Sequence, residues 1–317
     1  MRVAAGTARK AIRRANGFVD TAVLIAVMLL VVVGCYAMWD SKQVHRAASA
    51  ANYAIYKPTD EAGGHSFEEL RRMNPEVFGW LTVYGTHIDY PVTQGPDNMK
   101  YVNTNAQGQY SLSGAIFLDS NCEQDFSGFP SILYGHHMEK NTMFGEIGLF
   151  ADKSYFDARK YGMLYYGGQE HGLEFFAFVH ADAYDGAVFK ANIAGKDARQ
   201  AYLNMLLRTA IYTRGIQVTA DDRLVLLSTC SSRSTNGRDI LVGRITDTTW
   251  EDTFKSDETD KGNNLSADAL SLWAQIPAWA KLAIALLPLA LLIPLSFTIR
   301  SKRRSRGRKS SEGDRLQ

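Results

Sequence analysis

Cysteine is scarce in this chain, and the positions of its cysteines limit their roles. Only three occur among the 317 residues, and Cys35 lies inside a long apolar run. Cys122 and Cys230 remain. If both face an oxidising exterior they could form one disulfide, so a non-enzymatic, disulfide-stabilised ectodomain for adhesion or signalling is one alternative.

Signals for metal and nucleic-acid binding are also missing. No cluster of His, Cys and Asp has metal-site spacing, and no metal or organic cofactor is expected. The net charge of +2 is misleading, because five basic residues precede the first apolar run and eight follow the second. The part between them is mildly acidic, which argues against a nucleic-acid partner. The basic ends instead suit anionic lipid.

Charged residues are absent from two long segments, 21–39 and 282–299. A helix of about 19 apolar residues is long enough to cross a hydrocarbon core of about 30 Å. The second segment contains Pro288 and Pro294, which membrane helices tolerate better than soluble ones do. We therefore expect two transmembrane helices.

The basic ends fix the expected orientation. By the positive-inside rule both termini are cytoplasmic, and the middle of the chain is an extracellular domain at the cell membrane. A cleaved signal peptide is the alternative for 21–39, but the run exceeds the usual 7–15 apolar residues and no small-x-small cleavage site follows. The predicted division is a basic cytoplasmic tail (1–20), a transmembrane helix (21–39), a stalk or linker (40–65), a catalytic domain (66–248), a linker (249–281), a transmembrane helix (282–299) and a basic cytoplasmic tail (300–317).

The middle segment is mainly β in character. From Gly79 onward, short apolar or alternating runs are separated by Gly, Asn, Asp and Pro, as in strands. A short helix capped by Ser66, with Glu69 three residues later, precedes this pattern, and an amphipathic helix over 196–214 interrupts it. The pattern predicts a closed or nearly closed β-barrel with peripheral helices.

A predicted hairpin places an arginine beside Cys230. Cys230 ends the strand 223–230, an Asn-Gly turn signal follows, and Arg238 opens the return strand. Directly opposed side chains of an antiparallel pair lie about 5 Å apart, so this guanidinium can bind a substrate carbonyl and the oxyanion formed from it. Arg233 is less rigidly placed in the loop, and Arg244 lies about 20 Å along the strand.

A histidine is needed to move protons. His136 follows Gly135 at the end of a predicted strand, where its imidazole would stand at a rim, and the adjacent His137 is its rival. A thiol of pKa about 8.5 is only a few per cent ionised at pH 7, so a nearby imidazolium or arginine must help to supply thiolate. The same histidine can protonate a leaving amine.

Two short motifs resemble the signatures of sortases. The first is Leu227-Ser228-Thr229-Cys230 followed by Arg238, and the second is Tyr134-Gly135-His136 followed by Met138. The similarity to class B sortases extends over about 190 residues, through NPEVFGWLTVYGTHIDYPVTQGPDN, GAIFLD, YGHHM and TMF.

This resemblance implies the eight-stranded sortase barrel, with an N-terminal helix and a helix inserted between strands six and seven. It also implies residue roles: Cys230 as nucleophile, His136 as acid and base, and Arg238 at the oxyanion. The positions that match the family's substrate groove are Asn98, Tyr134, Ser228 and Thr229.

The implied reaction cleaves a C-terminal sorting signal of a secreted protein, forms a thioacyl enzyme and passes the acyl group to an amine of the cell-wall precursor. Two features depart from the class B pattern: Cys122, and the second membrane segment, which is commoner in pilin-polymerising sortases. A pilin lysine is therefore an alternative acceptor. A hydrolytic cysteine protease, in which water resolves the thioester, would use the same residues.

Overall fold

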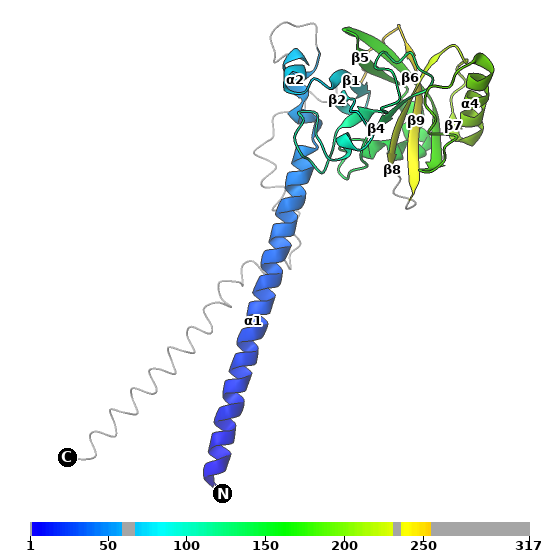
Figure 1. Ribbon diagram of the computed structural model, residues 1–317. Coiled ribbons are helices and arrows are strands. Elements are labelled where there is room, and N and C mark those ends of the chain that lie inside the picture. Colours follow the sequence, from blue (N-terminus) through cyan, green and yellow to red (C-terminus); the bar gives the residue numbers. More distant parts are fainter. Residues whose placement is uncertain (1, 59–66, 231–235, 255–317) are drawn as a thin grey trace. The chain divides into compact units, whose positions relative to one another are not determined.

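The computed structural model describes residues 2–58, 67–230 and 236–254. They form a long N-terminal helix and a β-rich domain (Figure 1). The predicted segment 282–299 and the basic tail after it lie outside the described residues, as do Ser66 and Arg233. The division into segments proposed above stays a prediction.

Helix α1 (Arg2–Ala47) contains the first predicted membrane segment. Within it, residues Arg14–Ala47 are long and apolar enough to cross a membrane, and an 18-residue window in this stretch has a mean hydropathy of 2.6. The apolar side chains along this stretch are exposed in the structure. A protein in water does not normally leave so many apolar side chains uncovered, which agrees with the expected transmembrane helix.

The chain joins the β domain directly after α1. Two 3₁₀ turns, η1 (Ala50–Asn52) and η2 (Ala54–Tyr56), follow the helix. The hydroxyl of Tyr90 donates to the carbonyl of Ala48 at 2.9 Å and accepts from the backbone N–H of Met143 at 2.9 Å. Ala48 is buried. Residues expected to form a loose stalk are therefore packed where they leave the helix.

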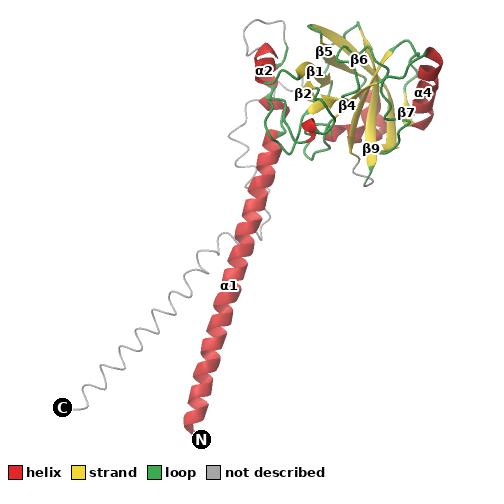
Figure 2. Cartoon of the chain, in the orientation of Figure 1, coloured by secondary structure: helices red, strands yellow, loops and turns green. Residues whose placement is uncertain are grey.

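The described part of the β domain is a closed barrel with one extra strand (Figure 2). Eight strands run in the order β5-β1-β2-β3-β4-β8-β9-β6, and pairing of β5 with β6 closes the ring, while β7 is added outside β6. This confirms the predicted eight-stranded barrel. The strands are β1 (Val77–Val83), β2 (Asp89–Thr93), β3 (Ile116–Leu118), β4 (Ser131–Tyr134), β5 (Tyr161–Tyr166), β6 (Gln169–Asp182), β7 (Ala210–Thr213), β8 (Arg223–Cys230) and β9 (Gly237–Thr246).

Alternation along β8 divides the core into two layers. Val225 and Leu227 belong to one buried cluster, whereas Leu224 and Leu226 belong to a second one that includes the inner face of helix α4 (Lys196–Thr209). Side chains of a strand alternate between the two faces of its sheet. Cys230 therefore shares the α4-covered face with Leu224 and Leu226.

Several short helices accompany the barrel. Helix α2 (Phe67–Met73) ends before Pro75, and 3₁₀ helix η4 (Gly145–Ala151) and helix α3 (Lys153–Ala158) follow the His136 loop. A further 3₁₀ turn is η3 (Lys100–Val102). The predicted helix over 196–214 is wrong at its end, because α4 stops at Thr209 and the next residues form β7 on β6. Sheet pairing is favoured there by the alternating, partly β-branched sequence AIYT.

Tyr90 should matter for stability more than its aromatic ring suggests. Tyr90→Phe removes the hydroxyl that joins Ala48 to the backbone of Met143. Leaving buried polar groups unpaired costs about 1–3 kcal/mol, so thermal or urea unfolding of the variant should show a lower free energy of unfolding. Tyr110→Phe is the matched control because Tyr110 is 78% exposed. Equal stability of the two variants would contradict the assigned role.

Candidate active site

The pairing of β8 with β9 brings Cys230 and Arg238 together. The two residues are direct partners in the antiparallel register, and Nη1 of Arg238 donates to Sγ of Cys230 at 2.7 Å. Cys230 is the exposed last residue of a strand whose preceding six residues are buried. A positively charged donor favours the thiolate form of a cysteine. The local geometry thus combines an accessible sulfur with a fixed cation.

Arg244 is excluded from this site by the same register. It pairs with Leu224 at the other end of β8, and its guanidinium binds the carboxylate of Glu174 at 2.7 Å. This agrees with the distance expected from strand spacing.

His136 stands just beyond β4, which pairs in parallel with β8. Its Nε2 lies 2.8 Å from the carbonyl oxygen of Val102. Gly135 permits this exit from the strand, because an added Cβ would come within 2.5 Å of Ile116 and 2.7 Å of Phe144. The close packing at Gly135 therefore fixes where His136 leaves the strand.

His137 lies elsewhere. A Cβ at Gly148 of η4 would be 3.9 Å from Cε1 of His137 and 3.2 Å from Oδ2 of Asp239. Asp239 is 1% exposed, and its Oδ1 lies 2.9 Å from Nδ1 of His180. Nδ1 of His137 is buried without a hydrogen-bond partner. His137 is thus near a buried polar cluster and is not a lining residue of the cleft described next.

One cleft of about 330 Å³ gathers every site residue predicted from the sequence. The predicted residues that line it are Asn98, Tyr134, His136, Ser228, Thr229, Cys230 and Arg238. Its further walls come from apolar residues that sequence reasoning did not identify, including Val102, Phe117 and Phe189. The cleft therefore combines a small polar end with an apolar, aromatic wall, as small-molecule and peptide sites commonly do.

Asp119 organises one wall of this cleft and was missed by the sequence reasoning. Its Oδ2 accepts from Nδ2 of Asn98 at 2.8 Å and from the hydroxyl of Tyr134 at 3.0 Å. Burial, reinforced by this carboxylate, raises the pKa of Tyr134 far above its ordinary value. The Tyr134 hydroxyl therefore stays protonated. The available signal was the polar residue that ends the apolar run GAIFLD.

Ser228 and Thr229 carry buried hydroxyls with no hydrogen-bond partner in the described structure. Ser228 shares the face of Cys230, two residues away, so its hydroxyl is suitably placed to meet a ligand in the cleft. Thr229 alternates to the other face and pairs with Asp239. Thr229 is nevertheless one of the residues that line the cleft.

Comparisons with known proteins match this arrangement. A sortase B from the type II pilus of Streptococcus pneumoniae is 45% identical, with 58% of this chain and 99% of that one covered and a TM-score of 0.51. This chain belongs to the class B sortase family. It is accordingly a cysteine transpeptidase. No family model matches it.

Other class B sortases are similar over the same region. A Streptococcus pyogenes class B sortase involved in pilus biogenesis is 38% identical, covering 56% of this chain and 97% of that one, with a TM-score of 0.52. Among curated proteins, sortase B of Listeria monocytogenes is 27% identical over 208 residues, which is 65% of this chain and 82% of the relative. Helix α4 lies between β6 and β8, which are the sixth and seventh barrel strands in chain order, as the resemblance implied.

The disulfide alternative is wrong. Cys122 and Cys230 are both free thiols, and Cys122 is buried with its sulfur directed toward the carbonyl of Pro130 at 3.7 Å. Within the described residues, no group of three or more His, Cys, Asp or Glu could hold a metal ion.

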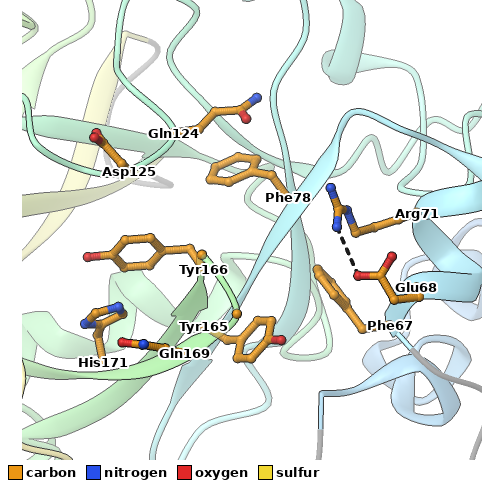
Figure 3. A pocket seen from close by; sticks show the side chains of 12 residues that line it. Phe67, Glu68, Arg71, Phe78, Gln124, Asp125, Tyr165, Tyr166, Gln169 and His171 are labelled. Atoms are coloured by element: carbon orange, nitrogen blue, oxygen red, sulfur yellow. Dashed lines mark hydrogen bonds and ion pairs between the residues drawn. The ribbon is translucent and has the colours of Figure 1, made fainter.

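A second cleft, of about 500 Å³, lies between α2, β1 and the β5–β6 turn (Figure 3). Aromatic side chains such as Phe78 and Tyr166 line it. Arg223, the first residue of β8, donates to the Tyr166 hydroxyl at 2.7 Å. Cys230 is the last residue of that strand, about 23 Å away at about 3.3 Å per residue. This second cleft is therefore separate from the sortase site.

The two cysteines of the β domain should differ sharply in reactivity. Burial raises the pKa of Cys122 to about 11, so at pH 7.5 its thiolate fraction is on the order of 10⁻³ or less, whereas Cys230 is exposed beside a cation. Brief iodoacetamide treatment of the native protein, followed by peptide-level mass spectrometry, should label Cys230 and spare Cys122. Labelling of Cys122 at the same rate would contradict the assignment; denatured protein is the control.

Proposed function

We propose that Cys230, His136 and Arg238 are the catalytic residues of this sortase. The observation that supports this most strongly is the 2.7 Å contact between Arg238 Nη1 and Cys230 Sγ in a cleft that His136 also lines. A thiol, an imidazole and a guanidinium are the groups that acyl transfer through a thioester needs.

In the first half-reaction the Cys230 thiolate attacks the carbonyl carbon of the scissile peptide bond. The carbonyl oxygen becomes an oxyanion, which Arg238 stabilises with its charged N–H donors. The C–N bond then breaks, and the leaving amine takes a proton from the imidazolium of His136. The product is a thioester on Cys230.

In the second half-reaction an acceptor amine attacks the thioester carbon. His136 removes the proton of the amine, the C–S bond breaks, and Cys230 leaves as thiolate. A carbonyl oxygen only accepts hydrogen bonds, so the contact with Val102 requires a proton on Nε2 of His136. Nδ1 is then the ring atom that is left to exchange protons during the cycle.

The donor substrates are proposed to be secreted surface proteins with a C-terminal sorting signal, and the acceptor an amine of the cell-wall precursor. Asn98, Tyr134, Ser228 and Thr229 are proposed to bind the signal peptide, with Asp119 holding the first two of them. The apolar helix in α1 supports membrane anchoring of this enzyme, and we propose that its catalytic domain lies outside. The second span and the cytoplasmic position of both termini remain part of this proposal.

A pilin lysine is the second candidate acceptor. The specific observation in its favour is that two solved class B sortases similar to this chain, at 45% and 38% identity, are described as pilus proteins. The two acceptors differ in their surroundings, since a lysine amine projects from a folded protein and a cell-wall precursor amine ends a short peptide.

The decisive experiment incubates the full-length enzyme with candidate sorting peptides, alone and with each class of amine. Ligated product in the presence of amine is expected, and the identity of the productive amine selects the acceptor. Continued cleavage without any ligated product would favour the hydrolytic protease alternative. Cys230→Ala should form no thioester, and turnover by that variant would refute the nucleophile assignment.

His136 and His137 provide a matched pair of variants. His136→Ala should lower kcat by about 10²–10⁴-fold, as expected for loss of a general acid and base. His137→Ala should change kcat much less, because His137 is not among the cleft's lining residues. Steady-state kinetics with a fluorogenic sorting peptide checks this, and melting curves of both variants control for folding. A larger loss for His137→Ala would exchange their roles.

A further inference from the structure

A loop at the edge of the active-site cleft exposes several large apolar side chains to solvent. The rim loop, defined here as residues 99–112, contains Met99, Tyr110 and Leu112, whose exposed fractions are 72%, 78% and 56%. Its one charged side chain, Lys100, is paired with Glu76 at 2.7 Å. The rest of the loop is neutral.

The rim loop is held in a defined position. Nδ2 of Asn74 donates to the carbonyl of Ala106 at 3.0 Å, and the backbone N–H of Ser111 donates to Asn103 at 3.0 Å. The first bond holds the loop against the barrel, and the second closes the loop on itself. Its exposed apolar side chains are consequently a standing feature of the surface.

The rim loop also contacts the segment that follows α1. Tyr53 and Ala106 line the same small apolar cavity. Tyr53 lies only six residues beyond the end of α1.

The connection between the apolar helix and the β domain is short. The charge-free run ends at Trp39, yet Val44 and His45 are already half-buried, and Nδ1 of His45 is inaccessible to solvent. Six helical residues rise about 9 Å at about 1.5 Å per residue. The headgroup layer on each side of a bilayer is about 5–7 Å thick. The part of the domain that meets α1 thus lies close to the bilayer surface.

We propose that the rim loop is a membrane-contacting surface, with Tyr110 and Leu112 seated among the lipid headgroups. Tyrosine is enriched at this depth because its ring is apolar and its hydroxyl is polar, and interfacial segments bury apolar side chains about 5–10 Å into the headgroup and acyl boundary. The occupant is a phospholipid surface. The inference rests on the membrane anchoring proposed above.

Membrane contact by this loop has a consequence for the active site. Val102, within the rim loop, lines the cleft, and its carbonyl is the hydrogen-bond partner of His136. A loop resting on lipid orients the cleft rim toward the bilayer. Substrates and acceptors that are themselves held at the membrane would then reach the thiol with little displacement.

The test uses the full chain reconstituted in phosphatidylcholine–phosphatidylglycerol vesicles that contain doxyl lipids. In a Cys35→Ser, Cys230→Ala background, an environment-sensitive fluorophore is attached at Tyr110→Cys or Leu112→Cys. The doxyl group quenches only fluorophores within or at the bilayer. Because both positions are exposed, the substitutions should not disturb folding, and melting curves verify this.

Two reference positions make the result interpretable. Leu30→Cys lies in the apolar part of α1, whereas Ile211→Cys is an exposed apolar site, 42% accessible, on β7. In the sheet order β7 lies beyond β6, far from the β2–β3 connection that contains the rim loop. Quenching of both rim-loop labels at least about twofold above that of the β7 label is expected for insertion at headgroup depth.

Rim-loop quenching equal to that of the Ile211→Cys label, with strong quenching at Leu30→Cys, would overturn this inference and leave membrane anchoring intact. Absence of quenching at Leu30→Cys would instead refute the anchoring itself.

Discussion

The register between β8 and β9 is the constraint on which the rest of the site depends. It makes Cys230 and Arg238 direct partners, so the hairpin alone brings a sulfur within 2.7 Å of a guanidinium. A slip of one residue would send every side chain of the strand to the opposite face. The apolar residues of β8, divided between the barrel interior and the α4 layer, oppose such a slip.

Closure of the barrel brings His136 to the hairpin that holds Cys230 and Arg238. The parallel pairing of β4 with β8 aligns Tyr134 with Ser228, so the chain that leaves β4 carries His136 to the end of β8 where Cys230 lies. Packing around Gly135 and the contact with Val102 then orient the imidazole. Three residues separated by about 100 positions in the sequence converge because of two strand pairings.

Much of the active site could be predicted from the sequence, and the parts that could not were formed by tertiary packing. Strand alternation and the Asn-Gly signal were sufficient to pair Cys230 with Arg238, since that contact is local to one hairpin. The roles suggested for His136 and the groove residues came from resemblance to sortases. Asp119 could not be found because its partners, Asn98 and Tyr134, meet it only through tertiary packing. β7 was missed because its residues continue a helical apolar pattern and are recruited by β6.

Alternation also explains why adjacent residues at these strand ends differ in environment. Cys230 and Arg238 share one face, while their neighbours Thr229 and Asp239 pair on the other. On that face Asp239 contacts His180, and both Asp239 and His137 lie next to Gly148 of η4. The sheet thus separates an accessible thiol, guanidinium and imidazole from a buried carboxylate and its imidazole partner. Because a buried carboxylate requires polar partners, this inner cluster ties together β6, β9 and the segment after His136, directly behind the cleft.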